Sequence, residues 1–360
     1  WVIAPSNDEE IDGLGPLYNS ISCLACHAGN GRGRAPDGPT EKMRSMLVRL
    51  SIPGENPFHS EPHPVYGGQL QEFAVPGVPA EGRAEVHYEY SSITLSEGET
   101  LTIRKPSIQL VNPGYGEFGE VLTSARIGPA LVGMGLIEMI DKQEILSWQD
   151  PDDKNADGIS GRVNWIIDEA RQTRHVGRFG YKANIATLDE QIASAFQADL
   201  GLTSALFPEE NCSSVQTDCQ QAVSGGEPEL TAEQLQAVSF YLQFLAVPAP
   251  RDQSEPEVIR GRAVFDEAGC TACHRPQLKT SLTAKPAAFA NRLIAPYSDF
   301  LLHDMGEELS DHRPDNGARG SEWRTSPLWG IGLAEKVGDK VGYLHDGRAT
   351  TLLEAILWHG

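Results

Sequence analysis

The alternation of apolar and polar positions predicts strands in two stretches of the N-terminal half. Residues 44–52 and 84–111 alternate between apolar and polar side chains, as a strand with one buried face requires. Inside the second stretch, Ser96-Glu-Gly-Glu99 separates two alternating runs, which is typical of a hairpin. We therefore expect a β-rich insertion at about residues 44–111.

Helical spacing predominates outside this insertion. Apolar residues recur every three or four positions around residues 130–148, 187–200 and 231–245. Thr231 precedes the third run and is a suitable N-cap, because its hydroxyl can accept a hydrogen bond from a free backbone N–H. The patterns predict a mainly α fold that carries one β-rich insertion.

Two copies of Cys-x-x-Cys-His carry the clearest chemistry. Two thiols at this spacing can reach the two vinyl groups of a haem, and the adjacent imidazole can reach its iron. A zinc site or a redox dithiol would also use Cys-x-x-Cys, but the His directly after each second Cys favours haem c. The residues are Cys23, Cys26 and His27 in the first copy, and Cys270, Cys273 and His274 in the second.

The residues before each motif are similar. Gly13–Ser22 and Gly261–Gly269 both predict a short helix that begins at Gly and carries an aromatic residue, Tyr18 or Phe265, before the cysteines. An aromatic residue in this place packs against the porphyrin edge in c-type cytochromes. Each half of the chain therefore indicates a cytochrome c-like domain, and the whole chain indicates a fused pair.

A Pro-rich segment at residues 247–256 is the best candidate for a domain boundary. The chain has 360 residues, a length typical of two or three domains. We expect an N-terminal haem c domain at 1–250, which contains the insertion, and a C-terminal haem c domain at 251–360.

The charge and hydropathy of the chain exclude some partners. The net charge of -21 makes nucleic acid an unsuitable partner, although it could steer a basic redox protein. No run approaches 18 apolar residues, so the sequence predicts no membrane span.

The cysteine chemistry predicts export to the periplasm or beyond the cell. Cys212 and Cys219 lie in a polar loop and predict a local disulfide, with a catalytic or metal-binding thiol pair as the alternative. A disulfide and covalent haem are both typical of exported proteins, and the chain begins at Trp1 without Met. We therefore expect that a leader was removed.

A loop at residues 150–161 has separate chemistry. Asp153, Asn155 and Asp157 place oxygen atoms at alternate positions before a Gly, as in the first half of an EF-hand loop. The bidentate Glu expected at the twelfth position is replaced by Asn164. Calcium binding and an Asx-rich turn both remain open.

The C-terminal segment has the most specific pattern, with Tyr343-Leu-His345-Asp-Gly followed by Leu352-Leu-Glu354-Ala. Together with the two haem motifs, it resembles the bacterial di-haem cytochrome c peroxidase superfamily. The chain is most similar to the di-haem oxidoreductase branch, also called thiol oxidoreductases. The similarity is most specific in four segments: Tyr18–Gly33, Arg126–Glu138, Arg178–Gly201 and Tyr297–His359.

The resemblance implies a second axial ligand for the C-terminal haem. The family usually places Met seven residues after the conserved Leu, and this chain has His359 there. A helix that starts near Thr351 would carry this residue about two turns on, over the haem face. His359 could instead be a frayed terminal residue. Imidazole in place of a thioether usually lowers a haem potential. The resemblance therefore does not predict that this chain uses the family's usual electron donor.

The resemblance also implies roles in and around the N-terminal haem pocket. Tyr181 takes the place of an aromatic residue between the haems and could relay electrons or hold a radical, or it is a packed core residue. Gln191 matches a distal-pocket residue. Asp199 lies two positions short of a catalytic Glu and could move protons, or it is a helix-terminal Asp. Arg324 is a candidate partner for a haem propionate or for a surface ion pair.

The N-terminal haem has no evident second ligand, which favours an open iron. The resemblance then implies an exported di-haem c oxidoreductase that reduces hydrogen peroxide or a similar small oxidant. A small redox protein would exchange electrons with the bis-His haem. Two alternatives remain: an electron-transfer cytochrome without catalysis, and oxidation of a protein partner through a high-valent di-haem state. Histidines in less certain loops could still ligate the first iron, namely His59, His63, His87 and His175.

Overall fold

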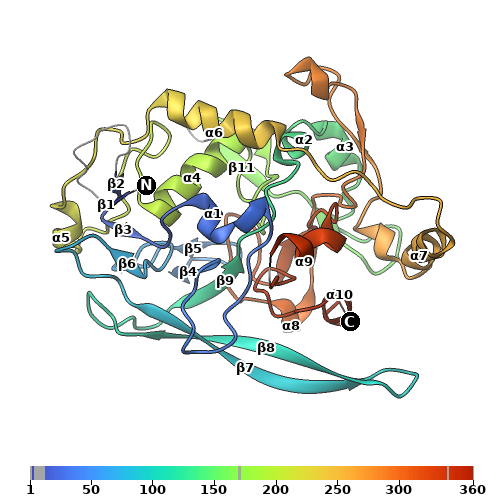
Figure 1. Cartoon of the computed structure of the whole chain (residues 1–360), viewed down its shortest axis with the longest axis horizontal. Coiled ribbons are helices and arrows are strands. Elements are labelled where there is room, and N and C mark those ends of the chain that lie inside the picture. The colour runs from blue at the N-terminus through green and yellow to red at the C-terminus, as the bar shows by residue number, and fades with distance from the viewer. Residues whose placement is uncertain (1, 4–12, 169–171, 339, 360) are drawn as a thin grey trace.

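The computed structural model describes residues 2–3, 13–168, 172–338 and 340–359 (Figure 1). Helices make up 24 % of the chain and strands 23 %, so the expectation of a mainly α fold is wrong. Strands also form outside the predicted insertion, in sheets of two or three strands among the described residues. Many of these strands have only two to four residues, too few to produce an alternation in the sequence.

The described helices are mostly short. The α-helices are α1 (Cys23–Cys26), α2 (Met134–Glu138), α3 (Lys142–Ser147), α4 (Leu188–Leu200), α5 (Thr217–Gln220), α6 (Ala232–Phe244), α7 (Pro256–Glu267), α8 (Gly306–Leu309), α9 (Ala334–Val337) and α10 (Leu352–Leu357). The 3-10 helices are η2 (Ala28–Asn30), η3 (Cys270–Ala272), η4 (Ala287–Phe289) and η5 (Ile331–Leu333).

The strands are distributed over the whole chain. They are β1 (Val2–Ile3), β2 (Gly13–Leu14), β3 (Leu17–Tyr18), β4 (Met46–Pro53), β5 (Ser60–Glu61), β6 (Phe73–Ala74), β7 (Arg83–Thr94), β8 (Thr100–Val111), β9 (Leu122–Ile127), β10 (Gly161–Arg162), β11 (Trp165–Asp168), β12 (Thr173–Val176), β13 (Leu278–Lys279), β14 (Leu293–Ile294), β15 (Leu302–Asp304) and β16 (Glu322–Arg324).

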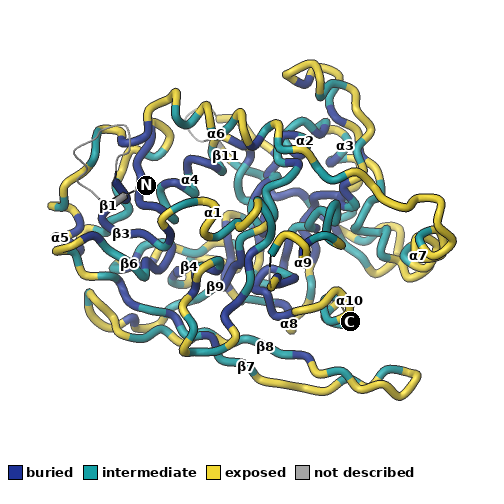
Figure 2. The backbone as a smooth tube through the Cα atoms, viewed as in Figure 1, coloured by how far each residue is buried: buried dark blue, intermediate teal, exposed yellow. Residues whose placement is uncertain are grey.

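The predicted strands of the insertion are confirmed. β7 and β8 form an antiparallel hairpin whose register runs from Arg83 opposite Val111 to Thr94 opposite Thr100. The hairpin extends along one side of the molecule, and its outer half is largely exposed (Figures 1 and 2). β4 pairs in antiparallel fashion with β9, beyond the predicted insertion.

The predicted helices are also confirmed. α4 and α6 each begin with a capping box, in which Thr187 or Thr231 bonds the backbone of the third helical residue while that residue's side chain bonds back. The region 130–148 forms the two short helices α2 and α3. α6 packs against both α4 and α2, so these helices form one layer beside the sheet of β4 and β9 (Figure 1).

The segment before the first motif differs from the prediction. Gly13–Ser22 forms β2 and β3 instead of a helix, whereas Gly261–Gly269 lies largely within α7, as predicted. Gly15 explains the difference, because a Cβ there would lie 1.8 Å from the Gly201 carbonyl oxygen. The extended backbone at Gly15 therefore docks directly onto the C-terminal end of α4.

Two hydrophobic clusters form most of the core. The first joins α4 and α6 to residues beyond position 250, including Leu278 and Phe300. The second lies between β4, β9 and the base of the hairpin. Figure 2 shows this buried centre and the largely exposed hairpin and α7 around it. The division into domains 1–250 and 251–360 stays a prediction.

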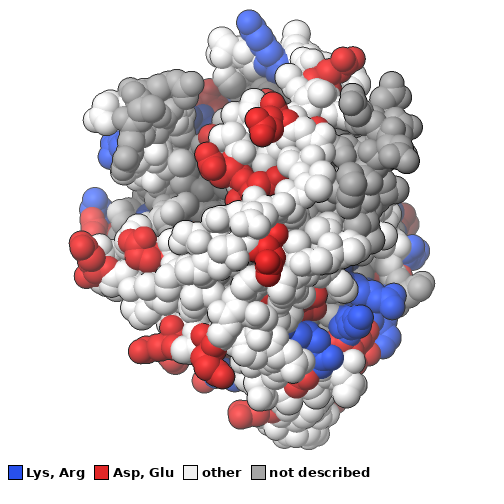
Figure 3. All heavy atoms as spheres, turned by 90° about the vertical axis from the view of Figure 1, so that its left-hand side faces the viewer, with Lys and Arg blue, Asp and Glu red and all other residues white. Residues whose placement is uncertain are grey.

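The surface charges and the character of the helices fit the acidic composition of the chain. On the face shown in Figure 3, Asp and Glu side chains are spread widely, and Lys and Arg gather towards one edge. Among the helices of the described chain, none has the length and apolar character needed to cross a membrane.

A buried carboxyl group should make stability depend on pH. Glu81 is 1 % exposed and accepts hydrogen bonds from Gln71 N (2.7 Å) and Gln216 Nε2 (2.6 Å). Burial raises its pKa to about 8. The contribution of Glu81 to the free energy of unfolding is therefore fully present below its unfolded-state pKa, near 4.3. As the pH rises from there through 8, this contribution is lost at about 1.4 kcal/mol per pH unit. Urea unfolding at several pH values should show a flatter slope for Glu81→Gln; an unchanged slope would contradict this assignment.

Candidate functional site

A cavity of about 530 Å³ lies beside the first Cys-x-x-Cys-His motif. Its wall combines residues of α1, β4, α4 and β16 with the segment that follows β9. Cys23, Cys26 and His27 all line it. The structure thus places both thiols and the imidazole of one motif on the wall of one cavity.

His27 is held in a defined orientation. Its Nδ1 lies 2.7 Å from the Pro129 carbonyl oxygen, so Nδ1 carries the proton and Nε2 remains free to bind a metal. A Cβ at residue 128 would lie 3.0 Å from His27 Cε1, and Gly128 permits this close approach. Burial lowers the pKa of His27, which favours the neutral, ligating form. Burial also raises the pKa of Cys26 to about 11.

The second motif is arranged in the same way. His274 Nδ1 lies 2.8 Å from the Tyr297 carbonyl oxygen, which again leaves Nε2 free. The Phe265 ring meets the His274 ring edge-on, with centroids 6.2 Å apart. Cys273 Sγ lies 3.6 Å from His303 Nδ1, and His303 Nε2 lies 2.8 Å from Asp299 Oδ2.

His359 faces His274 although the two are far apart in sequence. α10 begins after Thr351, whose hydroxyl accepts a hydrogen bond from Glu354 N, and His359 follows the end of this helix. The His359 Nδ1 atom lies 2.8 Å from the Ala355 carbonyl oxygen, so its Nε2 is also free.

The spacing of these two imidazoles suits a shared metal ion. Their ring centroids lie 6.5 Å apart. A metal–nitrogen bond is about 2 Å long, and the ring centre lies behind the nitrogen, so two imidazoles on one ion have centres about 6 Å apart. The donor set fits a bis-His haem, as the sequence predicts.

Gln191 and Asp199 lie on one face of α4. Both line the cavity, as does Ala195 between them, because residues four apart share a helix face. Asp199 Oδ1 accepts a hydrogen bond from Gln69 Nε2 (2.9 Å). Burial raises the pKa of Asp199, while the hydrogen bond from Gln69 and the charge of Arg49 lower it in part. The structure thus brings both predicted distal residues to the cavity.

Tyr181 and Arg324 are neighbours on another part of the cavity wall. Arg324 N donates to the Tyr181 carbonyl oxygen (2.8 Å), and Arg324 Nε donates to Gly180 O (2.8 Å). Burial lowers the pKa of Arg324 to about 10. The Tyr181 hydroxyl is buried and has no hydrogen-bond partner among the described residues. A hydroxyl donor and a guanidinium on one wall suit a haem carboxylate, which would give the hydroxyl an acceptor.

The sequence analysis missed three further arginines of the cavity wall, Arg32, Arg49 and Arg126. Arg126 Nη2 lies 2.9 Å from Asp315 Oδ2. The available signal was a cationic residue inside an otherwise largely apolar strand, since Arg49 interrupts the run from Met46 to Leu50.

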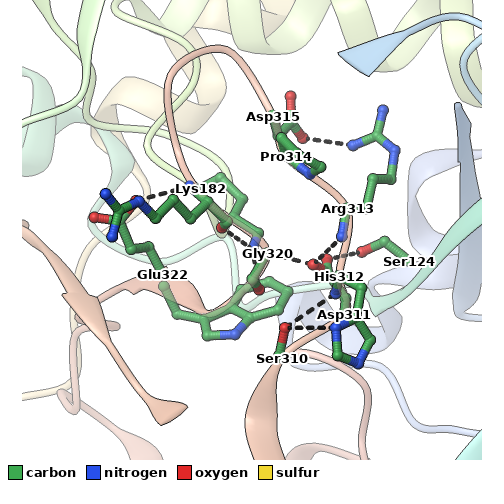
Figure 4. A network of polar contacts seen from close by, with 12 residues as sticks. Ser124, Lys182, Ser310, Asp311, His312, Arg313, Pro314, Asp315, Gly320 and Glu322 are labelled. Atoms are coloured by element: carbon green, nitrogen blue, oxygen red, sulfur yellow. Dashed lines mark hydrogen bonds and ion pairs between the residues drawn. The ribbon is translucent and has the colours of Figure 1, made fainter. Parts of the chain in front are cut away.

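Arg126 joins a buried ionic network through Asp311 and Asp315. Figure 4 shows the part of this network around Asp311, Asp315 and Lys182. Asp315 also binds Arg313 at 3.0 Å. Asp311 accepts from Ser124 Oγ (2.6 Å) and binds Lys182 Nζ (3.3 Å). Although burial alone would raise it, Arg126 and Arg313 hold the pKa of Asp315 well below its usual range. This network fixes the β9 end of the cavity wall.

Side chains of the Asp-rich loop at residues 150–161 accept hydrogen bonds from backbone N–H groups of the same loop. Asp153 Oδ1 accepts from Asp157 N (3.0 Å), and Asn155 Oδ1 accepts from the same N–H (3.0 Å). Across the described residues, no group of three or more His, Cys, Asp or Glu side chains is placed to hold a metal ion. The contacts are those of an Asx-rich turn, and calcium binding stays a prediction.

The remaining predicted cysteines and histidines lie elsewhere. Cys212 and Cys219 form the predicted disulfide, with Cα atoms 5.8 Å apart. Among the described residues that line the cavity, His27 is the only histidine. The four other candidates for the first iron are outside the wall: His59, His63, His87 and His175.

One comparison with known proteins identifies a family. A family model described as "Di-haem oxidoreductase, putative peroxidase" matches residues 2–360. No curated protein and no solved structure matches the chain. The matched region includes both Cys-x-x-Cys-His motifs, the cavity residues and His359.

Proposed function

Because the chain belongs to the di-haem oxidoreductase family, we propose that it reduces a small oxidant such as hydrogen peroxide at its N-terminal haem. A cavity of about 530 Å³ lies beside His27, and no second histidine lines it among the described residues, which leaves one face of the iron without a histidine ligand. The C-terminal haem, between His274 and His359, would store and pass electrons. The facing imidazoles are the observation that supports this division of labour.

Both haems would be attached covalently. Each pair of motif cysteines has free thiols in the structure, at the spacing that two vinyl groups require. Covalent haem and the Cys212–Cys219 disulfide favour an exported, periplasmic protein. The net charge of -21 would suit a basic redox protein as the electron donor or acceptor.

When bound in the cavity, haem iron supplies the redox chemistry, and the protein supplies proton transfer and orientation. Asp199 would take the proton of one peroxide oxygen and deliver it to the other as the O–O bond breaks. Its raised pKa suits this role, because an acid that titrates nearer neutral pH can both give and accept a proton. The Gln191 amide, on the same face of α4, would orient the oxidant by hydrogen bonding.

The relay role of Tyr181 stays a prediction, and the described contacts of Tyr181 also suit a second role. Its hydroxyl has no described acceptor that could take the phenolic proton, which oxidation to a neutral radical would release. Arg324 and Arg32 lower its pKa in part, against a larger rise from burial. We propose that Tyr181 and Arg324 hold a carboxylate of the N-terminal haem, next to the segment that leads to the second haem.

Rapid mixing of the oxidised holoprotein with equimolar hydrogen peroxide tests the proposal. We expect the absorption bands of the N-terminal haem to change within milliseconds, with one peroxide consumed per chain. Spectra that stay unchanged over minutes would contradict peroxide reduction and support a pure electron-transfer cytochrome.

A further inference from the structure

Arg49 points from the strand β4 into the cavity. Met46, Val48 and Leu50 alternate with it and are buried in the core. Leu47 and Arg49 lie on the opposite face of β4, and both line the cavity. The strand therefore places a cationic side chain on the wall of the N-terminal haem pocket.

The guanidinium of Arg49 has no partner in the described protein. Its Nε atom is buried without an acceptor, and no described residue forms a hydrogen bond or ion pair with the rest of the group. Arg126, the neighbouring arginine of the wall, has Asp315 at 2.9 Å. Arg49 is half-buried, and a buried polar atom without a hydrogen-bond partner, such as its Nε, costs about 1–3 kcal/mol. A bound anion would remove much of this penalty.

The nearest carboxyl group is a poor counter-ion for Arg49. Asp199 contributes electrostatically to Arg49, but its Oδ1 atom is bonded to Gln69 Nε2 at 2.9 Å. Burial raises the pKa of Asp199, which disfavours its charged form.

Arg49 and Tyr181 differ in most of their electrostatic neighbours, although Arg126 is common to both. The neighbours of Tyr181 are Arg32, Arg324, Asp346 and Arg126. Those of Arg49 are Arg126, Asp199 and Asp315. Arg49 therefore has the proposed proton donor as a neighbour, whereas Tyr181 does not.

We propose that Arg49 binds a small inorganic anion in the cavity, at the place where the oxidant reacts. This inference rests on the proposed function. Hydrogen peroxide takes two electrons from the two haems and two protons, the O–O bond breaks, and two water molecules form. Arg49 stabilises the negative charge that builds up on the departing oxygen before Asp199 protonates it.

Fluoride is a suitable probe, because it is a small anion that binds ferric haem without redox chemistry. We expect Arg49→Leu in the oxidised holoprotein to weaken fluoride binding about 10- to 100-fold, the effect of losing one charge-assisted hydrogen bond. Arg49→Gln, which keeps a polar side chain in the wall, should give the same result if the leucine variant does not fold. Arg49→Lys should restore part of the affinity. Arg44→Leu, at an exposed arginine, is the matched control and should leave fluoride affinity unchanged.

Imidazole is a neutral ligand, so its binding distinguishes the loss of a positive charge at Arg49 from a general change in the haem pocket. Its affinity should be the same in wild type and in Arg49→Leu. Fluoride affinity that is unchanged in Arg49→Leu would overturn the inference, as would an equal loss for fluoride and imidazole. A shifted haem potential with unchanged fluoride affinity would assign Arg49 to a haem carboxylate and also overturn it. A wild-type protein that binds neither ligand would instead refute the open haem of the proposed function.

Discussion

Replacing His359 by Gly is expected to convert the C-terminal haem from low spin to high spin. Two imidazoles give the iron a strong ligand field, and removal of one leaves a five-coordinate or water-bound iron. The facing rings of His274 and His359, with centroids 6.5 Å apart, support our proposal that His359 is the second ligand. The absorption and magnetic resonance spectra of the oxidised variant should show the change in one haem per chain, with the N-terminal haem unaltered.

Two controls make this result specific to ligation. Added imidazole should enter the space left in His359→Gly and return the C-terminal haem to low spin, while the open N-terminal haem binds imidazole in wild type and variant alike. His312→Gly removes an exposed histidine and should change nothing. An unchanged spectrum for His359→Gly would show that this residue is only the end of α10.

Replacing Asp199 by Asn is expected to slow the reaction with hydrogen peroxide by about 10²- to 10⁴-fold, the usual contribution of a positioned acid–base group. Asn has the same shape and can still bond Gln69, but it cannot carry a proton between the peroxide oxygens. The spin states of both haems should stay the same, because Asp199 is not an iron ligand. Stopped-flow measurement of the second-order rate constant checks this.

The pH profile adds a second readout. Burial raises the pKa of Asp199, so the wild-type rate constant should change at a pH above the ordinary pKa of an aspartate. This change of rate with pH should be absent in Asp199→Asn. Asp189→Asn, on the same helix outside the cavity, is the matched control. An Asp199→Asn protein that reacts at the wild-type rate would mean that another group transfers the proton.

The residues that we propose bind haem stand out in the sequence because their patterns are local. Cys-x-x-Cys-His specifies its chemistry within five residues, and Thr351 marks the start of the short helix that carries His359. The long hairpin could also be predicted from the sequence. β7 and β8 each have twelve residues, and the inner residues alternate between more and less buried side chains. Such features depend on neighbours along the chain.

The missed features depend on contacts between distant segments. Gly13–Ser22 was expected to be a helix because it resembles the segment before the second motif, but its backbone is extended and Gly15 packs against Gly201. The mainly α expectation failed because short strands such as β10, β15 and β16 exist only through their pairing with one another.

Residues of the cavity wall were missed for the same reason. Gln69 meets Asp199 across 130 positions in sequence, and Arg49 is recognisable as a pocket residue only once β4 lies beside α4. Strand alternation placed Arg49 on one face of β4, but the sequence gives no sign of what that face contacts.

The ratio of spin states in the oxidised holoprotein tests the central claim most directly. Low-temperature electron paramagnetic resonance of protein with two haems per chain should show one high-spin and one low-spin ferric haem in equal amounts. Two low-spin signals, with no high-spin component, would contradict an open N-terminal haem and the peroxide chemistry assigned to it.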